Sequence, residues 1–122
     1  MSNNTFKILK IHIHQLCFMI ILFFSISVKA QKVHSVEHEN QADIKVFVVE
    51  LANMADLKVY RVNYSNQVGN NDGNWFFTEH GNQSDKKIFF TQLANQADIK
   101  IFYVEYSNQA GWNDTSKKKF FE

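Results

Sequence analysis

A short motif recurs through the chain at a regular spacing, and this repeat constrains the fold more than any other feature. The motif is Asn-Gln-x-Asp or Asn-Gln-x-Gly, with one substitution in some copies. Successive copies begin 13 residues apart, except for one step of 16. Their first residues are Asn40, Asn53, Asn66, Asn82, Asn95 and Asn108. The spacing divides the chain into two matching halves of three units each, offset by 42 residues.

The residues that follow each motif predict a β-strand. In four units, a run of seven residues begins with Asp-x-Lys and is rich in β-branched and aromatic residues. Such runs are typical of strands, and the Asn-rich motif between them supplies turn formers. We therefore expect an all-β domain with strands at 42–49, 55–62, 74–79, 85–92 and 98–105.

Side chains alternate along a strand, so each unit has two faces. In the first unit, Ile44, Val46 and Val48 share an aliphatic face, which we expect to be buried. The opposite face carries the Asp-x-Lys pair followed by an aromatic residue. We expect these aromatic residues to be mostly buried as well: Phe47, Tyr60, Phe76, Phe89 and Phe102.

The third unit of each half replaces the aspartate by glycine and continues into a longer turn. We expect Gly69, Gly73 and Gly111 to have positive φ, which glycine adopts without a steric penalty. The sixth unit ends in a Phe-Phe pair at 120–121, which we expect to pack in the core.

The first thirty residues have the composition of a targeting segment. Two lysines precede an apolar run from Leu16 to Val28, and Ala30 ends a triplet that suits a signal peptidase. The run is short for a membrane span, which needs about 20 residues. We therefore expect residues 1–30 to be a signal peptide cleaved near Ala30, with an uncleaved anchor as the alternative. The protein would then be secreted or periplasmic, without a stable membrane span after cleavage.

Removal of that segment changes the composition of the chain. The single cysteine and three of the 13 basic residues would leave, while all 12 acidic residues would stay, so the net charge would be −2. This balance lacks the basic footprint of a nucleic-acid binder. We expect residues 31–39 to form a flexible segment and residues 40–122 to form the β-repeat domain.

The best-formed cassettes resemble a known family. Residues 95–104 read Asn-Gln-Ala-Asp-Ile-Lys-Ile-Phe-Tyr-Val, and residues 108–113 read Asn-Gln-Ala-Gly-Trp-Asn before a Lys-rich end. This pattern resembles the bacterial 7(1) septoil knot domain over about residues 40–122, and departs from it at Met54, where other cassettes have glutamine. The resemblance implies a small β-rich domain whose backbone forms a seven-crossing torus knot. It implies no established activity and no catalytic residues. The alternative architecture is an unknotted β-meander or a short solenoid.

The repeated polar residues have two interpretations. We favour a structural role as turn formers and local ion pairs, because aspartate often bonds nearby backbone groups in turns. The alternative is a ring of carboxylates that binds a cation or a small polar ligand. The asparagines are expected to adopt left-handed turn geometry. The residues concerned are Asn40, Asp43, Lys45, Asn53, Asp56, Lys58, Asn82, Asp85, Lys87, Asn95, Asp98 and Lys100.

For three aromatic residues, Trp75, Tyr103 and Trp112, we favour packing in the core or over the open ends of the fold, with a binding surface for a peptide or sugar as the alternative. His34 and His38 have a helix-like metal spacing, but no cysteine accompanies them, so we expect no metal and no cofactor. No catalytic motif is recognisable. The sequence therefore favours a secreted structural or interaction module with a protein or glycan partner. A small-ligand or cation binder and an enzyme with an irregular site are the alternatives.

Overall fold

The computed structural model describes residues 31–67 and 70–122. The predicted signal peptide at residues 1–30 and the predicted turn residue Gly69 lie outside the described residues. Within the described ranges, no helix is long and apolar enough to cross a membrane.

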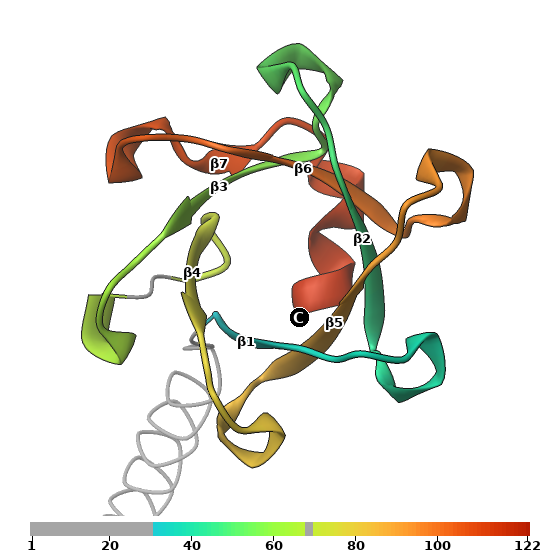
Figure 1. Ribbon diagram of the computed structural model, residues 1–122. Helices are drawn as coiled ribbons and strands as arrows, with labels where there is room; N and C mark the ends of the chain where they lie inside the picture. Colours follow the sequence, from blue (N-terminus) through green and yellow to red (C-terminus); the bar gives the residue numbers. More distant parts are fainter. Residues whose placement is uncertain (1–30, 68–69) are drawn as a thin grey trace, which may run out of the picture.

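Short strands alternate with short 3-10 turns along the described chain (Figure 1). The strands are β1 (Lys32–Ser35), β2 (Ile44–Val48), β3 (Leu57–Arg61), β4 (Asn74–Phe77), β5 (Lys86–Phe90), β6 (Ile99–Tyr103) and β7 (Gly111–Trp112). The turns are η1 (Glu39–Gln41), η2 (Ala52–Met54), η3 (Ser65–Gln67), η4 (Gly81–Gln83), η5 (Ala94–Gln96) and η6 (Ser107–Gln109), and a longer 3-10 helix follows as η7 (Thr115–Phe121). The five predicted strands are confirmed as β2 to β6, each inside its expected range.

Six of the strands close into a barrel in which neighbouring strands run parallel. Their order is β4-β1-β5-β2-β6-β3, and a further pairing of β4 with β3 closes the ring. Strands β1, β2 and β3 therefore alternate round the ring with β4, β5 and β6, and the chain passes twice round the barrel (Figure 1). This parallel order rules out the β-meander, in which consecutive strands are antiparallel neighbours. The interleaved winding agrees with the architecture that the family resemblance implies, while the knot itself stays a prediction.

The predicted aliphatic face of the repeat strands points into the barrel, but Val48 at the end of β2 is 40% exposed, so its expected burial was wrong. One residue from each of the six strands forms a middle layer, and all six are completely buried. These residues are Val33, Val46, Val59, Trp75, Ile88 and Ile101. The core is therefore a single filled column along the barrel axis.

The aromatic residues of the opposite face lie on the outside of the barrel, yet each keeps only a minor part of its surface exposed, so the expectation that they are mostly buried is confirmed. No helical layer of the described chain covers this outer face. The strand register instead places cassette lysines opposite the aromatic residues, as with Lys45 opposite Phe89 and Lys58 opposite Phe102. A lysine stem can cover apolar surface while its ammonium group stays in water. Such pairing explains the partial burial.

The expectation of a flexible segment at residues 31–39 was also wrong. Strand β1 lies between β4 and β5, and Gln31 and Val33 are buried. The sequence signal is weak because β1 carries His34 and Ser35 where other strands have aromatic or larger residues. β1 nevertheless supplies the sixth strand of the barrel, since the sixth repeat unit forms only the short β7, which pairs antiparallel with β3.

The C-terminal helix η7 lies inside the ring of strands when the barrel is viewed along its axis (Figure 1). Phe121 is buried, with its ring centroid 5.2 Å from that of Trp75 and 6.0 Å from that of Trp112. Phe120 is partly buried against the same core. The predicted core packing of the 120–121 pair is therefore confirmed, although the pair belongs to a helix.

Two polar contacts fix η7 at the end of the barrel where the strands begin. Lys117 Nζ forms an ion pair with Asp56 Oδ2 at 3.0 Å, and Asp56 immediately precedes β3. Asn71 Nδ2 donates to the carbonyl oxygen of Lys118 at 3.1 Å, and Asn71 lies shortly before β4. Because the barrel strands are parallel, their carboxyl ends meet at the opposite end of the barrel.

Candidate functional site

The four cassette aspartates connect neighbouring strands. Asp98 shows the arrangement: its Oδ2 accepts the backbone N–H of Lys45 at 2.8 Å, and its own N–H donates to the Lys45 carbonyl at 2.8 Å. The same pair of bonds links Asp43 to Lys87, Asp56 to Lys100 and Asp85 to Lys32. Each carboxylate is therefore engaged by the backbone of another strand, which supports a structural role for these residues.

The expected ion pairs inside the Asp-x-Lys cassettes do not form among the described residues, so this detail was wrong. Lys45 pairs instead with Glu39 at 2.8 Å, and the hydrogen bond and negative charge of Glu39 raise the pKa of the lysine. Both side chains are exposed, so the pair stabilises the fold little. The described part of the chain contains no group of three or more His, Cys, Asp or Glu side chains arranged to hold a metal ion.

The repeat asparagines lie at the centres of the turns η1 to η6. Their expected left-handed geometry was wrong, because Asn71 is the one described non-glycine residue with positive φ, at 52°. Gly73 and Gly111 have the predicted positive φ, at 91° and 152°. At Gly73, a β-carbon would also collide with the carbonyl oxygen of Lys58, so the close approach of β3 and β4 requires glycine.

The three aromatic residues of the predicted binding surface do not lie together. Trp75 is completely buried in the barrel, and its Nε1 has no hydrogen-bond partner among the described residues. Trp112 packs against η7, and its Nε1 donates to the Asn71 carbonyl at 2.8 Å. Tyr103 lies at the carboxyl end of β6. The alternative of one shared binding surface was therefore wrong, and the favoured core packing is confirmed for Trp75.

A different set of side chains is exposed at the corners of the barrel, where the six short turns project outward (Figure 1). We call the residue immediately before each turn a corner residue, and all six are exposed. In the order of the strands round the barrel, the corner residues are His80, His38, Leu93, Leu51, Tyr106 and Tyr64. The four apolar corner residues therefore occupy consecutive corners, with exposed fractions of 53% to 67%.

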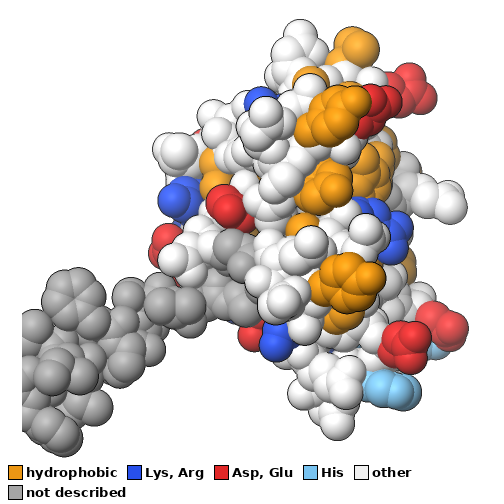
Figure 2. Space-filling view, turned by 90° about the vertical axis from the view of Figure 1, so that its left-hand side faces the viewer, with side chains coloured by type: hydrophobic (Ala, Val, Ile, Leu, Met, Phe, Trp, Pro, Cys, Tyr) orange, Lys and Arg blue, Asp and Glu red, His pale blue; other side chains and the backbone are white. Residues whose placement is uncertain are grey.

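Two other large hydrophobic side chains are exposed near one of the apolar corners. Val48 and Met54, on either side of corner residue Leu51, are 40% and 58% exposed. Figure 2 shows the side of the barrel that carries η3 and η6, where hydrophobic side chains reach the surface in several separate groups. The sequence does contain a signal for the corner positions, since the residue two places before each repeat asparagine is the same type in both halves.

The carboxyl ends of the strands form a second exposed feature, which we call the rim. It consists of the last inward-facing residue of each barrel strand: Ser35, Val48, Arg61, Phe77, Phe90 and Tyr103. The guanidinium carbon of Arg61 lies 4.1 Å from the centroid of the Phe77 ring. Burial raises the pKa of the Tyr103 phenol, and the positive charge of Arg61 opposes this increase.

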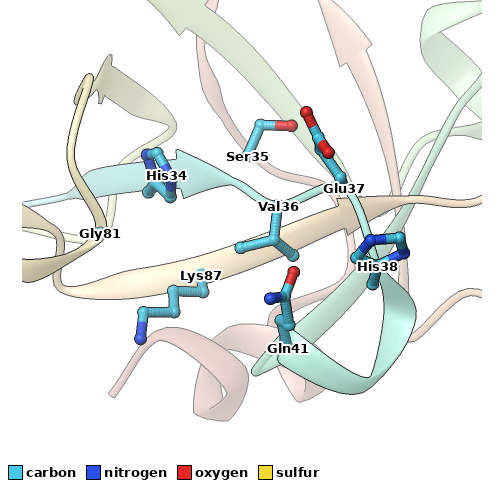
Figure 3. Close-up of a pocket in the computed structure, with 8 residues that line it drawn as sticks. All are labelled: His34, Ser35, Val36, Glu37, His38, Gln41, Gly81 and Lys87. Carbon is cyan, nitrogen blue, oxygen red and sulfur yellow. The ribbon is translucent and has the colours of Figure 1, made fainter.

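A shallow hollow of about 720 Å³ lies beside β1, between the turns η1 and η4 (Figure 3). The Nδ1 atom of His34 lies 2.9 Å from the Thr78 carbonyl, so it carries the proton of this hydrogen bond. In Figure 3, His34 and His38 lie on opposite sides of the Val36 side chain, and Lys87 and Glu37 point in opposite directions. The polar groups of this hollow do not converge on one point, as an active site would require.

These features define a small all-β protein: a closed parallel barrel of repeated strand–turn units whose repeated polar residues hold the backbone. A family comparison agrees with this class. The sequence model of the 7(1) septoil knot domain matches residues 30–113, and the chain therefore belongs to this family. The match includes β1 and ends before η7. No curated protein and no solved structure matches the chain.

Proposed function

We propose that this protein is an exported, rigid and non-catalytic binding module that holds a protein partner on its apolar corner residues. The observation that carries the proposal is the row of four large apolar side chains on consecutive corners. Single exposed hydrophobic residues are ordinary on protein surfaces, whereas patches of them mark interaction sites. Here the same residue types recur at the same position in both halves of the chain.

A protein partner suits these side chains better than a glycan does. Leu51, Met54 and Leu93 offer no hydrogen-bond donor for sugar hydroxyl groups. Tyrosine and methionine are enriched in protein–protein interfaces, and corner residues Tyr64 and Tyr106 add a hydroxyl group to a large apolar ring. The two remaining corners carry histidine, so the proposed surface covers one arc of the ring.

Rigidity is supported by the way the corners are held. Each of the turns η1 to η6 follows a strand of the closed barrel, and the aspartate bonds tie four of these strands to their neighbours. A preorganised surface loses little conformational entropy when it binds. The absence of catalysis is supported by the engagement of the repeated aspartates with backbone groups, because an active site needs unlike groups that converge.

The chain contains its own matched control for this surface, because histidines occupy the equivalent corners. We would compare the double variants Tyr64→Ser/Tyr106→Ser and Leu51→Ser/Leu93→Ser with His38→Ser/His80→Ser. Tagged protein would be cross-linked and recovered from the cell envelope. The proposal expects loss of a specific partner in the two apolar variants and its retention in the histidine variant. Equal recovery of that partner by all three variants, with unchanged thermal unfolding, would contradict it.

Export is tested separately, by sequencing the N-terminus of the protein in the envelope and the medium. We expect the exported chain to begin at or near Gln31, after the predicted signal peptide. Protein that retains Met1 and stays embedded in the membrane would show that the segment is an anchor instead.

A further inference from the structure

The rim differs from every other part of the barrel in its chemistry. The middle layer below it is aliphatic or aromatic and fully buried, whereas the rim combines three partly exposed aromatic rings with two hydroxyl groups and a guanidinium group. The strand order places Arg61 between Tyr103 and Phe77, because β3 lies between β6 and β4. The mouths of β-barrels are common positions for small-ligand sites.

Arg61 has unused hydrogen-bonding capacity. The two ion pairs among the described residues involve Lys45 and Lys117, and none of the side-chain hydrogen bonds between described residues comes from Arg61. One face of its guanidinium rests against the Phe77 ring, which leaves its N–H edge for a ligand. The hydroxyl groups of Ser35 and Tyr103 also make no hydrogen bond within the described chain.

We propose that the rim binds a small organic carboxylate with an apolar or aromatic body. The planar fork of an arginine matches a carboxylate through two parallel hydrogen bonds. The Phe77 ring supports one face of this fork, and Phe77 is itself packed edge-on against the buried Trp75 ring at 6.2 Å between centroids. Phe90 and Val48, on the other side of the rim, provide apolar surface for the body of the ligand.

A carboxylate fits better than a phosphate or a polyanion. Arg61 is the single cationic side chain of the rim, and one guanidinium pairs with one carboxylate without leaving charge unbalanced. A tyrosine phenol is protonated at neutral pH, and burial raises the pKa of Tyr103 further, so this hydroxyl group can donate a second hydrogen bond. This site is separate from the apolar corner residues, apart from Val48, which lies next to one of them.

The test uses 4-phenylbutyrate and its neutral analogue 4-phenylbutyramide, titrated into the protein as it is purified from the producing cells. Calorimetry would give the affinities, and amide chemical shifts would locate the site. We expect saturable binding of the carboxylate with shifts at the carboxyl ends of β3, β4 and β6, and at least tenfold weaker binding of the amide. A second arm compares the peptide Gly-Gly-Phe with its C-terminal amide, to distinguish a peptide end from a free organic acid.

Arg61→Gln should weaken 4-phenylbutyrate binding at least tenfold, because it removes the charge and the fork. Arg61→Lys should give an intermediate loss, since it keeps the charge alone. Lys119→Gln is the matched control, because Lys119 Nζ also lies near an aromatic ring, 5.8 Å from the Phe120 centroid, but on η7. Absence of saturable binding, equal binding of the acid and the amide, or full affinity in a folded Arg61→Gln protein would each overturn the proposal.

Discussion

Replacing Phe121 by alanine should destabilise the barrel strongly, although the residue lies in the last turn of the C-terminal helix. The side chain is 2% exposed and packs between two tryptophan rings. Transfer of a buried phenylalanine side chain to water costs about 1.5–3 kcal/mol, and a cavity that cannot collapse increases the loss to about 3–5 kcal/mol. Collapse is hindered here, because Trp75 is enclosed by the barrel and Trp112 is held through its Nε1 by Asn71.

Equilibrium urea unfolding, followed by tryptophan emission, measures this loss directly. The chain has two tryptophans, and both pack against Phe121, so the emission of the folded variant should change as well. Phe120→Ala is the control: its partly buried ring should contribute about 1–2 kcal/mol. If Phe121→Ala lost less than about 1 kcal/mol, or no more than the control, helix η7 would not be part of the core.

Three further predictions concern the backbone. Gly73→Ala should destabilise the protein far more than Gly111→Ala in thermal unfolding. Both positions have positive φ, but only at Gly73 would the added β-carbon collide with the Lys58 carbonyl oxygen. Equal effects of the two substitutions would contradict the close approach of β3 and β4. Asp98→Ala should lower the free energy of unfolding by about 1–3 kcal/mol in urea, because it leaves the part-buried backbone N–H of Lys45 without its carboxylate partner. An unchanged free energy of unfolding would argue against an interstrand role for Asp98. If the chain is knotted, unfolding and refolding should take minutes to hours in manual-mixing fluorescence experiments, because a terminus must thread through the barrel. Refolding that is complete within milliseconds would favour an unknotted winding of the same strands.

The repeat determined much of the local structure. A seven-residue run with alternating faces has only one regular conformation that buries its aliphatic side, and strands β2 to β6 therefore lie where the pattern predicts them. The positive φ of Gly73 and Gly111 follows from the same local rules, because glycine is the residue that adopts it freely. The family membership was also readable from two cassettes in register.

Only the tertiary structure decided which strands are neighbours, and most functional conclusions depend on that. Asp98 accepts a hydrogen bond from Lys45, which is 53 residues away, and nothing in either cassette encodes that distance. Strand β1 gains its conformation from β4 and β5, and η7 gains its position from the open end of the barrel, so neither needed a strong local pattern. The order of the strands likewise places the apolar corner residues at consecutive corners and sets Arg61 against Phe77. Local sequence selects backbone conformation and buried face, whereas contacts between distant segments form only when the whole barrel closes.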